Sequence, residues 1–190
     1  MRTLFIPALA LTAAAPAFAQ DATAPFSGPH IEAIGGWDRS QADGGHRDGV
    51  LYGVGAGYDI QRGSMVFGVD AEANDSSAKA CSGAATAASP RLCAKAARDL
   101  YVGGRVGTLV TPTTLLYAKA GYTNGRYKAT VDTGTGSNSL GADNLDGVRV
   151  GLGVEHALGS KAFIRTEYRY SNYQDGVSRN QVVAGVGMHF

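Results

Sequence analysis

The residues able to carry acid–base or metal chemistry are few and dispersed along the chain. The four histidines are His30, His46, His156 and His189, and none of them belongs to an HExxH motif or to a Cys/His cluster. Metal sites and general bases need their donor groups within reach of one another. The spacing therefore predicts no metal site and no cofactor, and structural roles for the histidines.

One fragment, Arg169-Tyr170-Ser171-Asn172, places a serine close to a basic residue. A serine becomes a nucleophile when a neighbouring base takes its proton, and an arginine guanidinium is always protonated and cannot do so. The fragment resembles the His-x-Ser-Asn motif of eight-stranded lipid A deacylases, with the essential base replaced. We therefore expect no catalytic residue, and a protein that is not an enzyme.

The first residues have the order of a secretory signal peptide. Arg2 is followed by an apolar run, and the small-x-small sequence Ala17-Phe18-Ala19 predicts cleavage before Gln20. We divide the chain into a signal peptide (residues 1–19), a polar leader (20–27) and one domain (28–190). Without Arg2 the chain has 16 basic and 16 acidic residues, so it has no electrostatic footprint for nucleic acid.

The two cysteines, Cys81 and Cys93, lie in one polar segment. In an exported chain a disulfide is the default, and closing this loop would stabilise the fold by about 3 kcal/mol. Two free thiols remain the alternative. A metal site is disfavoured because no histidine or second CxxC lies nearby.

The elements that must position these residues are eight segments in which apolar and polar residues alternate with a period of two. They are His30–Trp37, Val50–Ile60, Met65–Asn74, Leu100–Leu109, Leu115–Tyr122, Asn144–Ala157, Ala162–Tyr170 and Gln181–Phe190. The connections alternate between short turns and long polar segments, at 38–49, 75–99, 128–143 and 171–179. This pattern predicts an all-β fold, an eight-stranded antiparallel up-and-down transmembrane β-barrel with turns inside the envelope and loops outside.

The polar face of these strands carries five acids and five bases. They are Glu32, Asp70, Glu72, Arg105, Lys119, Arg149, Glu155, Arg165, Glu167 and Arg169. An eight-stranded barrel has an interior just wide enough for side chains to fill, and an unpaired charge there would cost several kcal/mol. The sequence thus predicts a lumen plugged by a charge network, with a gated ion path as the alternative.

The apolar face is expected to contact lipid. A soluble ligand-carrying barrel would turn that face inward and leave long runs of glycine in water, where glycine weakens a strand. The chain also ends on Phe190, with Met188 and Val186 behind it on the same apolar face. A terminal aromatic residue suits a membrane interface.

Three stretches resemble the porin-like, opacity-type outer-membrane β-barrel family. They are Leu115-Leu116-Tyr117-Ala118-Lys119-Ala120-Gly121-Tyr122, Glu167-Tyr168-Arg169-Tyr170-Ser171-Asn172-Tyr173 and Val183-Ala184-Gly185-Val186-Gly187-Met188-His189-Phe190. The resemblance implies a place in the outer membrane of a Gram-negative envelope. It also implies assembly by the outer-membrane insertion machinery, for which Phe190, Met188 and Val186 would be the signal. The Cys81/Cys93 segment departs from the family pattern.

From these features we expect an integral barrel with surface-exposed loops and a structural, envelope-stabilising or surface-interaction role. Its partners would be outer-membrane lipid and the insertion machinery, with no nucleic acid and a surface ligand that the sequence does not identify. The alternative is a narrow porin-like channel for ions or small polar solutes. The third hypothesis is a barrel enzyme that modifies lipid A.

Overall fold

The structure is a computed structural model that describes residues 25–42, 45–86, 89–134 and 136–190. The signal peptide and residues 20–24 of the leader therefore lie outside the described residues. Nine strands follow one another along the chain. They are β1 (Gly28–Ala42), β2 (Gly45–Arg62), β3 (Met65–Ser76), β4 (Lys79–Ser82), β5 (Arg91–Thr111), β6 (Thr114–Asp132), β7 (Ser137–Leu158), β8 (Ala162–Tyr173) and β9 (Ser178–His189).

Eight of these strands close into an antiparallel ring, as the alternation predicts. Each strand pairs with its neighbour, β3 pairs with β5, and β1 pairs with β9 to join the two ends of the chain. The ninth strand, β4, pairs with β5 beyond the ring. The only described helix is the short 3-10 turn η1 (Gln174–Gly176). No helix in the described part of the chain is long and apolar enough to cross a bilayer.

Side chains alternate between the lumen and the outer wall along each strand. On β2, Val50, Tyr52 and Val54 are about 60% exposed, whereas Asp59 is buried. The exposed apolar residues on all eight ring strands form the band that contacts lipid. The apolar face therefore points outward, as the sequence predicts.

Glycines on the inner face make room for long charged side chains. A Cβ atom built on Gly55 would collide with the Glu32 carboxylate, and one built on Gly68 would collide with the Asp59 carboxylate. These two glycines are thus required by the close approach of charged groups to the inner face of the strands.

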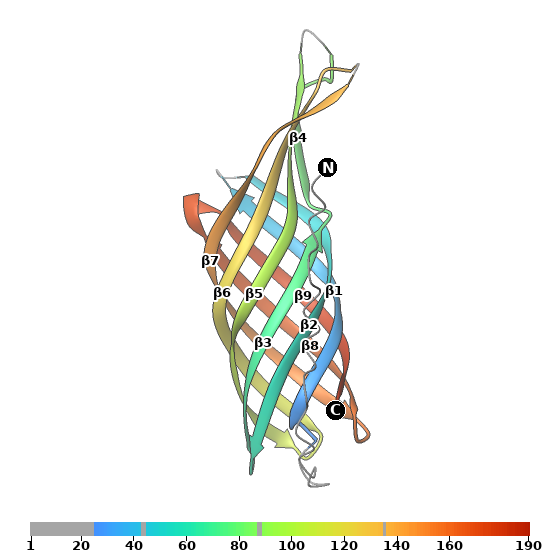
Figure 1. Cartoon of the computed structure of the whole chain (residues 1–190), viewed down its shortest axis with the longest axis vertical. Coiled ribbons are helices and arrows are strands. Elements are labelled where there is room, and N and C mark those ends of the chain that lie inside the picture. The colour runs from blue at the N-terminus through green and yellow to red at the C-terminus, as the bar shows by residue number, and fades with distance from the viewer. Residues whose placement is uncertain (1–24, 43–44, 87–88, 135) are drawn as a thin grey trace, which may run out of the picture.

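The long polar segments differ from the sequence prediction of loops. Segments 38–49 and 128–143 are mostly strand, and segment 75–99 contains β4 and the first part of β5. Figure 1 shows strands β4 to β7 continuing far above the barrel as a narrow twisted sheet. The prediction failed because both faces of these extensions meet water, so the period-two signal disappears although the backbone pairing continues.

The disulfide between Cys81 and Cys93 is present. The two cysteines are direct partners across β4 and β5. It joins the short strand β4 to the extension of β5, so it holds the membrane-distal sheet together rather than the barrel.

A network of charged side chains in the barrel lumen

The structure brings all ten charged residues of the predicted network into the lumen. Each of them is at most 6% exposed. They come from β1, β3, β5, β6, β7 and β8, so the network joins strands from every side of the ring. Its ion pairs fall into a central group and a group at each end of the barrel.

Glu72 is the hub of the central group. Its carboxylate pairs with Lys119, lies 2.8 Å from Arg169 Nη1 and lies 3.2 Å from Arg165 Nη2. Arg149 Nη1 is slightly further away, at 3.7 Å. Four cations from three strands thus share one acid of β3, which offsets the cost of burying the carboxylate.

A second acid, Glu167, balances the cations around Glu72. It lies 2.9 Å from Lys119 Nζ and accepts a hydrogen bond of 2.6 Å from Arg169 Nε. The hydroxyl of Tyr117 also donates to it, at 2.6 Å. Glu32 pairs with Arg165, which extends the group to β1.

The outer end of the lumen holds three charged residues that the sequence analysis assigned to loop ends. Arg179 Nη2 lies 2.6 Å from Asp38, and Arg179 Nη1 lies 3.2 Å from Asp99. Asp99 also pairs with Arg149. These residues were missed because the strands extend further out than the apolar alternation does.

The inner end of the lumen centres on Arg105. Its guanidinium donates to both oxygens of Asp59 and, at 2.8 Å, to Glu155. Asp59 was also missed by the sequence analysis. Its signal was available, because it continues the inward alternation of Gly53, Gly55 and Gly57.

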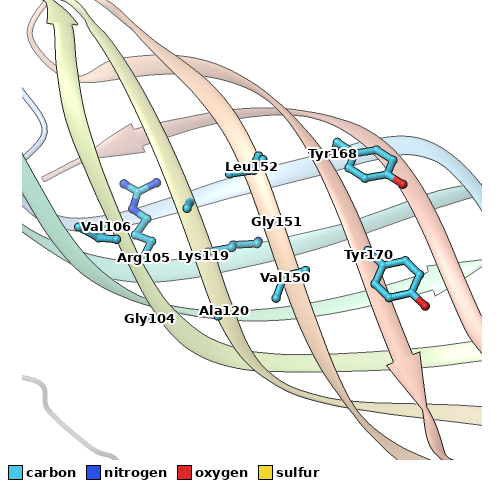
Figure 2. Close-up of a pocket in the computed structure, with 11 residues that line it drawn as sticks. Gly104, Arg105, Val106, Lys119, Ala120, Val150, Gly151, Leu152, Tyr168 and Tyr170 are labelled. Carbon is cyan, nitrogen blue, oxygen red and sulfur yellow. The ribbon is translucent and has the colours of Figure 1, made fainter.

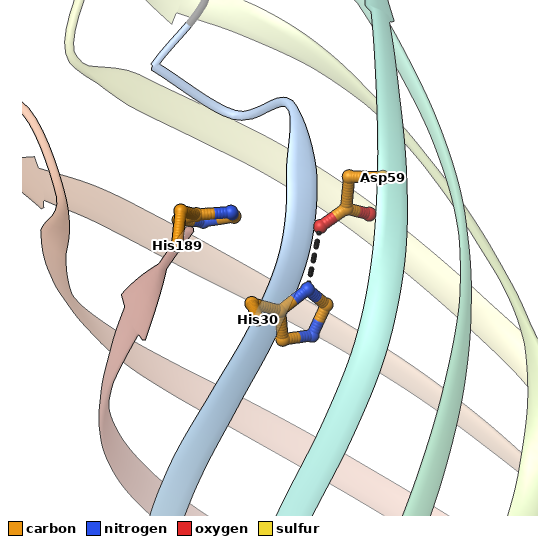
Figure 3. A group of neighbouring side chains, drawn as sticks. All are labelled: His30, Asp59 and His189. Atoms are coloured by element: carbon orange, nitrogen blue, oxygen red, sulfur yellow. Dashed lines mark ion pairs between the residues drawn. The ribbon is translucent and has the colours of Figure 1, made fainter. Parts of the chain in front are cut away.

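Two histidines complete this inner group (Figure 3). His30 Nδ1 lies 2.9 Å from Asp59, and His189 Nε2 lies 3.4 Å from Glu155. Donor atoms of His30, Asp59 and His189 lie within 4.8 Å of one another, a spacing that a divalent cation could bridge. Because Arg105 already engages both oxygens of Asp59, a metal would first have to displace a hydrogen bond.

The described residues contain more buried acids and bases than the ten that the sequence predicts, and the two kinds are not equal in number. The set contains eight carboxylates, six arginine or lysine side chains and the two histidines. The five-against-five count from sequence was therefore incomplete. The acids outnumber the permanent cations by two, and the two histidines are placed beside acids at the inner end.

Apolar residues pack together at the inner end of the lumen. Phe26 is fully buried and packs with Val66, Leu115, Tyr117 and Ala157. The backbone nitrogen of Phe26 donates to Gln61 Oε1 at 3.3 Å, which anchors it to β2. Phe26 belongs to the segment that the sequence analysis described as a polar leader, so this apolar contact was not foreseen.

The serine of the fragment compared with lipid A deacylases also points into the lumen. Ser171 is fully buried, and its hydroxyl accepts a hydrogen bond of 2.8 Å from Arg149 Nε. Arg169, at the position of the missing base, pairs with Glu72 and Glu167. Ser171 is thus one more partner of the charge network.

A shallow groove lies on the outer wall across β5, β6, β7 and β8 (Figure 2). Small residues, Gly104, Ala118 and Ala120, line it on β5 and β6, and Tyr168 and Tyr170 line it on β8. Its apolar outward lining suits the acyl chains of lipid.

The outer rim carries a cation close to an aromatic ring. The Arg39 guanidinium lies 4.8 Å from the Trp37 ring centroid, and Arg39 Nε donates to Asp48 at 2.8 Å. This hydrogen bond holds the pKa of the exposed Asp48 below its usual range. The pair lies at the ends of β1 and β2, on the membrane-distal side.

Comparison with known proteins agrees with this architecture. Residues 5–190 match the family model described as the outer membrane protein β-barrel domain. A 22 kDa outer membrane protein of Rhizobium leguminosarum bv. viciae is 32% identical over 159 residues, covering 75% of this chain and 69% of that protein.

Solved structures with the same fold are more distant in sequence. Neisserial surface protein A superimposes with a TM-score of 0.60 at 20% identity, covering 86% of this chain and 98% of that one. Ail, the attachment invasion locus protein of Yersinia pestis, solved in complex with the heparin analogue sucrose octasulfate, gives 0.57 at 16% identity, covering 86% and 99%.

Proposed function

The chain belongs to the outer membrane protein β-barrel family, and we propose that it acts there as a sealed, non-catalytic barrel that displays a rigid surface sheet. It is an integral protein of the Gram-negative outer membrane. The proposal adds to this placement a plugged lumen and a role in envelope structure or surface interaction.

The observation that carries the proposal is the continuity of the ion-pair network along the lumen. The inner group around Arg105, the central group around Glu72 and the outer group around Arg179 follow one another, and Phe26 covers the inner mouth. A permeating ion would have to displace several of these pairs at once. Because the effective dielectric is low there, that displacement is costly.

The surface role is supported by the sheet that extends beyond the barrel. Strands β5, β6 and β7 continue beyond the membrane-spanning ring, β4 pairs with β5 there, and a disulfide joins β4 to β5. A paired and cross-linked sheet has less conformational freedom than a loop, so the sheet loses less conformational entropy when a partner binds to it. The fold neighbour Ail was solved with a polyanion bound, which favours the same kind of role for this chain.

The test is conductance in planar bilayers. We expect the refolded wild-type chain to give no steady current, and a variant that lacks central charges, Arg169→Ala with Glu72→Ala, to give one. Val150→Ala on the lipid-facing wall is the matched control and should stay silent. A large steady current through the wild-type chain would refute the sealed lumen.

The narrow channel remains a second candidate because some buried polar atoms have no hydrogen-bond partner. They include Asp70 Oδ2, Glu32 Oε2 and Arg165 Nη1. Such atoms are commonly satisfied by water, and a chain of waters would favour a conduit. A steady conductance of the wild-type chain would favour the narrow channel.

The enzymatic hypothesis has a separate test, which is mass spectrometry of lipid A from cells that express the chain.

A further inference from the structure

The membrane-distal sheet carries three lysines in one row. Lys79 on β4 is the direct partner of Lys95 on β5, and Lys95 is the direct partner of Lys128 on β6. Direct partners in an antiparallel pair point to the same face. All three side chains are exposed, so three positive charges lie side by side on one surface.

This row lies on the same outer face as the lipid-contacting band. Along β6, Tyr122, Asn124, Arg126 and Lys128 follow at intervals of two, and Tyr122 is an exposed residue of the outer wall. The opposite set, with Thr123 and Gly125, is buried in the lumen. The lysines therefore project sideways from the wall, over the membrane, rather than over the barrel mouth.

The height of the row matches the headgroup region of the outer leaflet. The outward apolar residues of β5 end at Leu100, whose partner on β6 is Asn124. Lys128 lies four residues further along the strand, which is about 14 Å of strand and, at a tilt of about 40°, about 10 Å along the barrel axis. Arg126 lies between these two levels, opposite Asn144.

The cations of this face lack acidic partners within the described part of the chain. Lys79, Lys95, Lys128 and Arg126 make no ion pair with any described residue. The Nε atom of Arg126 is buried without a hydrogen-bond partner. Like charges placed directly opposite one another destabilise a sheet. An anion from outside the chain that binds between the lysines would reduce this repulsion.

The disulfide holds the row in place. Cys81 and Cys93 are the partner pair two residues beyond Lys79 and Lys95 on the same face. A covalent bond there keeps β4 paired to β5 despite the repulsion between the two lysines. The acyl-chain groove also lies on β5 and β6, on the same strands as two of the lysines.

From these observations we propose that the lysine row, Lys79, Lys95 and Lys128, together with Arg126, binds the phosphate groups of a phosphorylated glycolipid of the outer leaflet. The acyl chains of that lipid lie against the apolar wall, and its phosphorylated sugars reach the cations. The inference rests on the membrane placement of the barrel and is independent of the sealed lumen, so failure here would leave the conductance result untouched.

The experiment measures glycolipid retained by the full mature chain. The chain is refolded into phosphatidylcholine vesicles that contain diphosphorylated lipid A, released in mild detergent, and its bound lipid A is counted by mass spectrometry. Parallel arms use dephosphorylated lipid A, phosphatidylglycerol, and diphosphorylated lipid A with added inorganic phosphate. We expect retention of the diphosphorylated lipid alone, unaffected by inorganic phosphate.

The decisive variant is Lys79→Gln/Lys95→Gln/Lys128→Gln, which should lower retention about tenfold. Its matched control, Arg47→Gln/Arg62→Gln/Lys161→Gln, removes the same number of exposed cations elsewhere and should retain the lipid as wild type does. Circular dichroism and the intact disulfide check that both variants are folded.

Four outcomes would overturn the proposal. Equal loss in both triple variants would mean that only net charge matters, and equal retention of dephosphorylated lipid A would mean that the phosphates are not recognised. Displacement by inorganic phosphate, or binding of heparin to the row in place of lipid A, would assign the cations to a soluble anion instead.

Discussion

At the scale of single residues, most charged side chains in the centre of the lumen contact several others rather than one partner. Glu72 serves four cations, and Arg149 serves Asp99, Ser171 and Glu72. When one member of such a group is removed, the others remain buried and lose their compensation. Removal of one partner should therefore cost more than the pair contributes in total.

The first prediction concerns Arg149, which is fully buried. We expect Arg149→Ala to lower the free energy of unfolding by about 3–5 kcal/mol, the usual cost of leaving a buried charge unpaired. Denaturant unfolding of the refolded barrel in detergent micelles measures this. Arg39→Ala, which breaks the exposed pair with Asp48, is the control and should have no measurable effect.

A double-mutant cycle sharpens this prediction. Asp99→Ala combined with Arg149→Ala should cost clearly less than the sum of the two single changes, because each single change already removes the interaction between these two residues. Additive effects would contradict a shared network. The measurement is the same unfolding transition, made on all four proteins of the cycle.

Much of this network could be predicted from sequence, and the three residues missed at the outer end of the lumen share one physical cause. The residues on either side of Glu72 and Arg165 in the sequence belong to the apolar outer face. The alternation of apolar and polar residues therefore predicts that these two side chains point into the lumen. Asp38, Asp99 and Arg179 lie where the outer face has become polar, so the inward and outward residues no longer differ in type. Which residues meet across the lumen, such as Glu72 and Arg169, depends on how the strands close into a ring. The local sequence pattern does not predict these contacts.

At the scale of elements, a single strand has two environments along its length. The inner half of β7 contacts lipid through residues such as Val150, and its outer half belongs to the sheet above the membrane. Val150 lies between Ala120 on β6 and Tyr170 on β8 and is 51% exposed. A charge placed there has no water to solvate it.

The second prediction follows from this division of β7. Val150→Arg should destabilise the barrel in vesicles by about 2–4 kcal/mol, the cost of a cation near the bilayer midplane. Leu140→Arg changes an exposed residue of the same strand above the membrane and should be tolerated. Equal assembly of both variants in detergent-free vesicles would show that the outer wall does not contact lipid at Val150.

The third prediction concerns the disulfide between β4 and β5. Maleimide added to intact cells should label neither Cys81 nor Cys93 until a reductant is present. In Cys93→Ser, the remaining Cys81 is exposed and should be labelled without reductant. Labelling of both thiols in the untreated wild-type chain would show that the bridge does not form in cells.

At the scale of the whole molecule, the barrel closes only when its last strand meets its first. Strand β9 pairs with β1 along twelve residues of register, and the backbone nitrogen of Phe190 donates to Pro29 at 2.9 Å. The seam therefore forms after the whole chain is available. Phe190 follows directly after β9, and its exposed ring continues the apolar face of that strand at the inner rim of the barrel.

The last prediction separates recognition of that ring from its part in stability. Phe190→Ala keeps the backbone and its hydrogen bond to Pro29 but removes an exposed aromatic side chain. We therefore expect slow assembly in cells, with loss of protein to periplasmic proteases, and a nearly unchanged unfolding transition of the refolded barrel. Surface proteolysis of intact cells measures the first, and denaturant titration measures the second.

Phe67→Ala is the matched control, because Phe67 is a similarly exposed aromatic residue on β3 and is remote from the terminal strand. If both variants reach the surface equally slowly, the defect reflects loss of an aromatic contact with lipid and not a terminal signal. If Phe190→Ala reaches the surface at the wild-type level, the terminal residue is not needed for assembly. Slow assembly of Phe190→Ala alone, with normal refolding, is the result that a machinery reading the last residue requires.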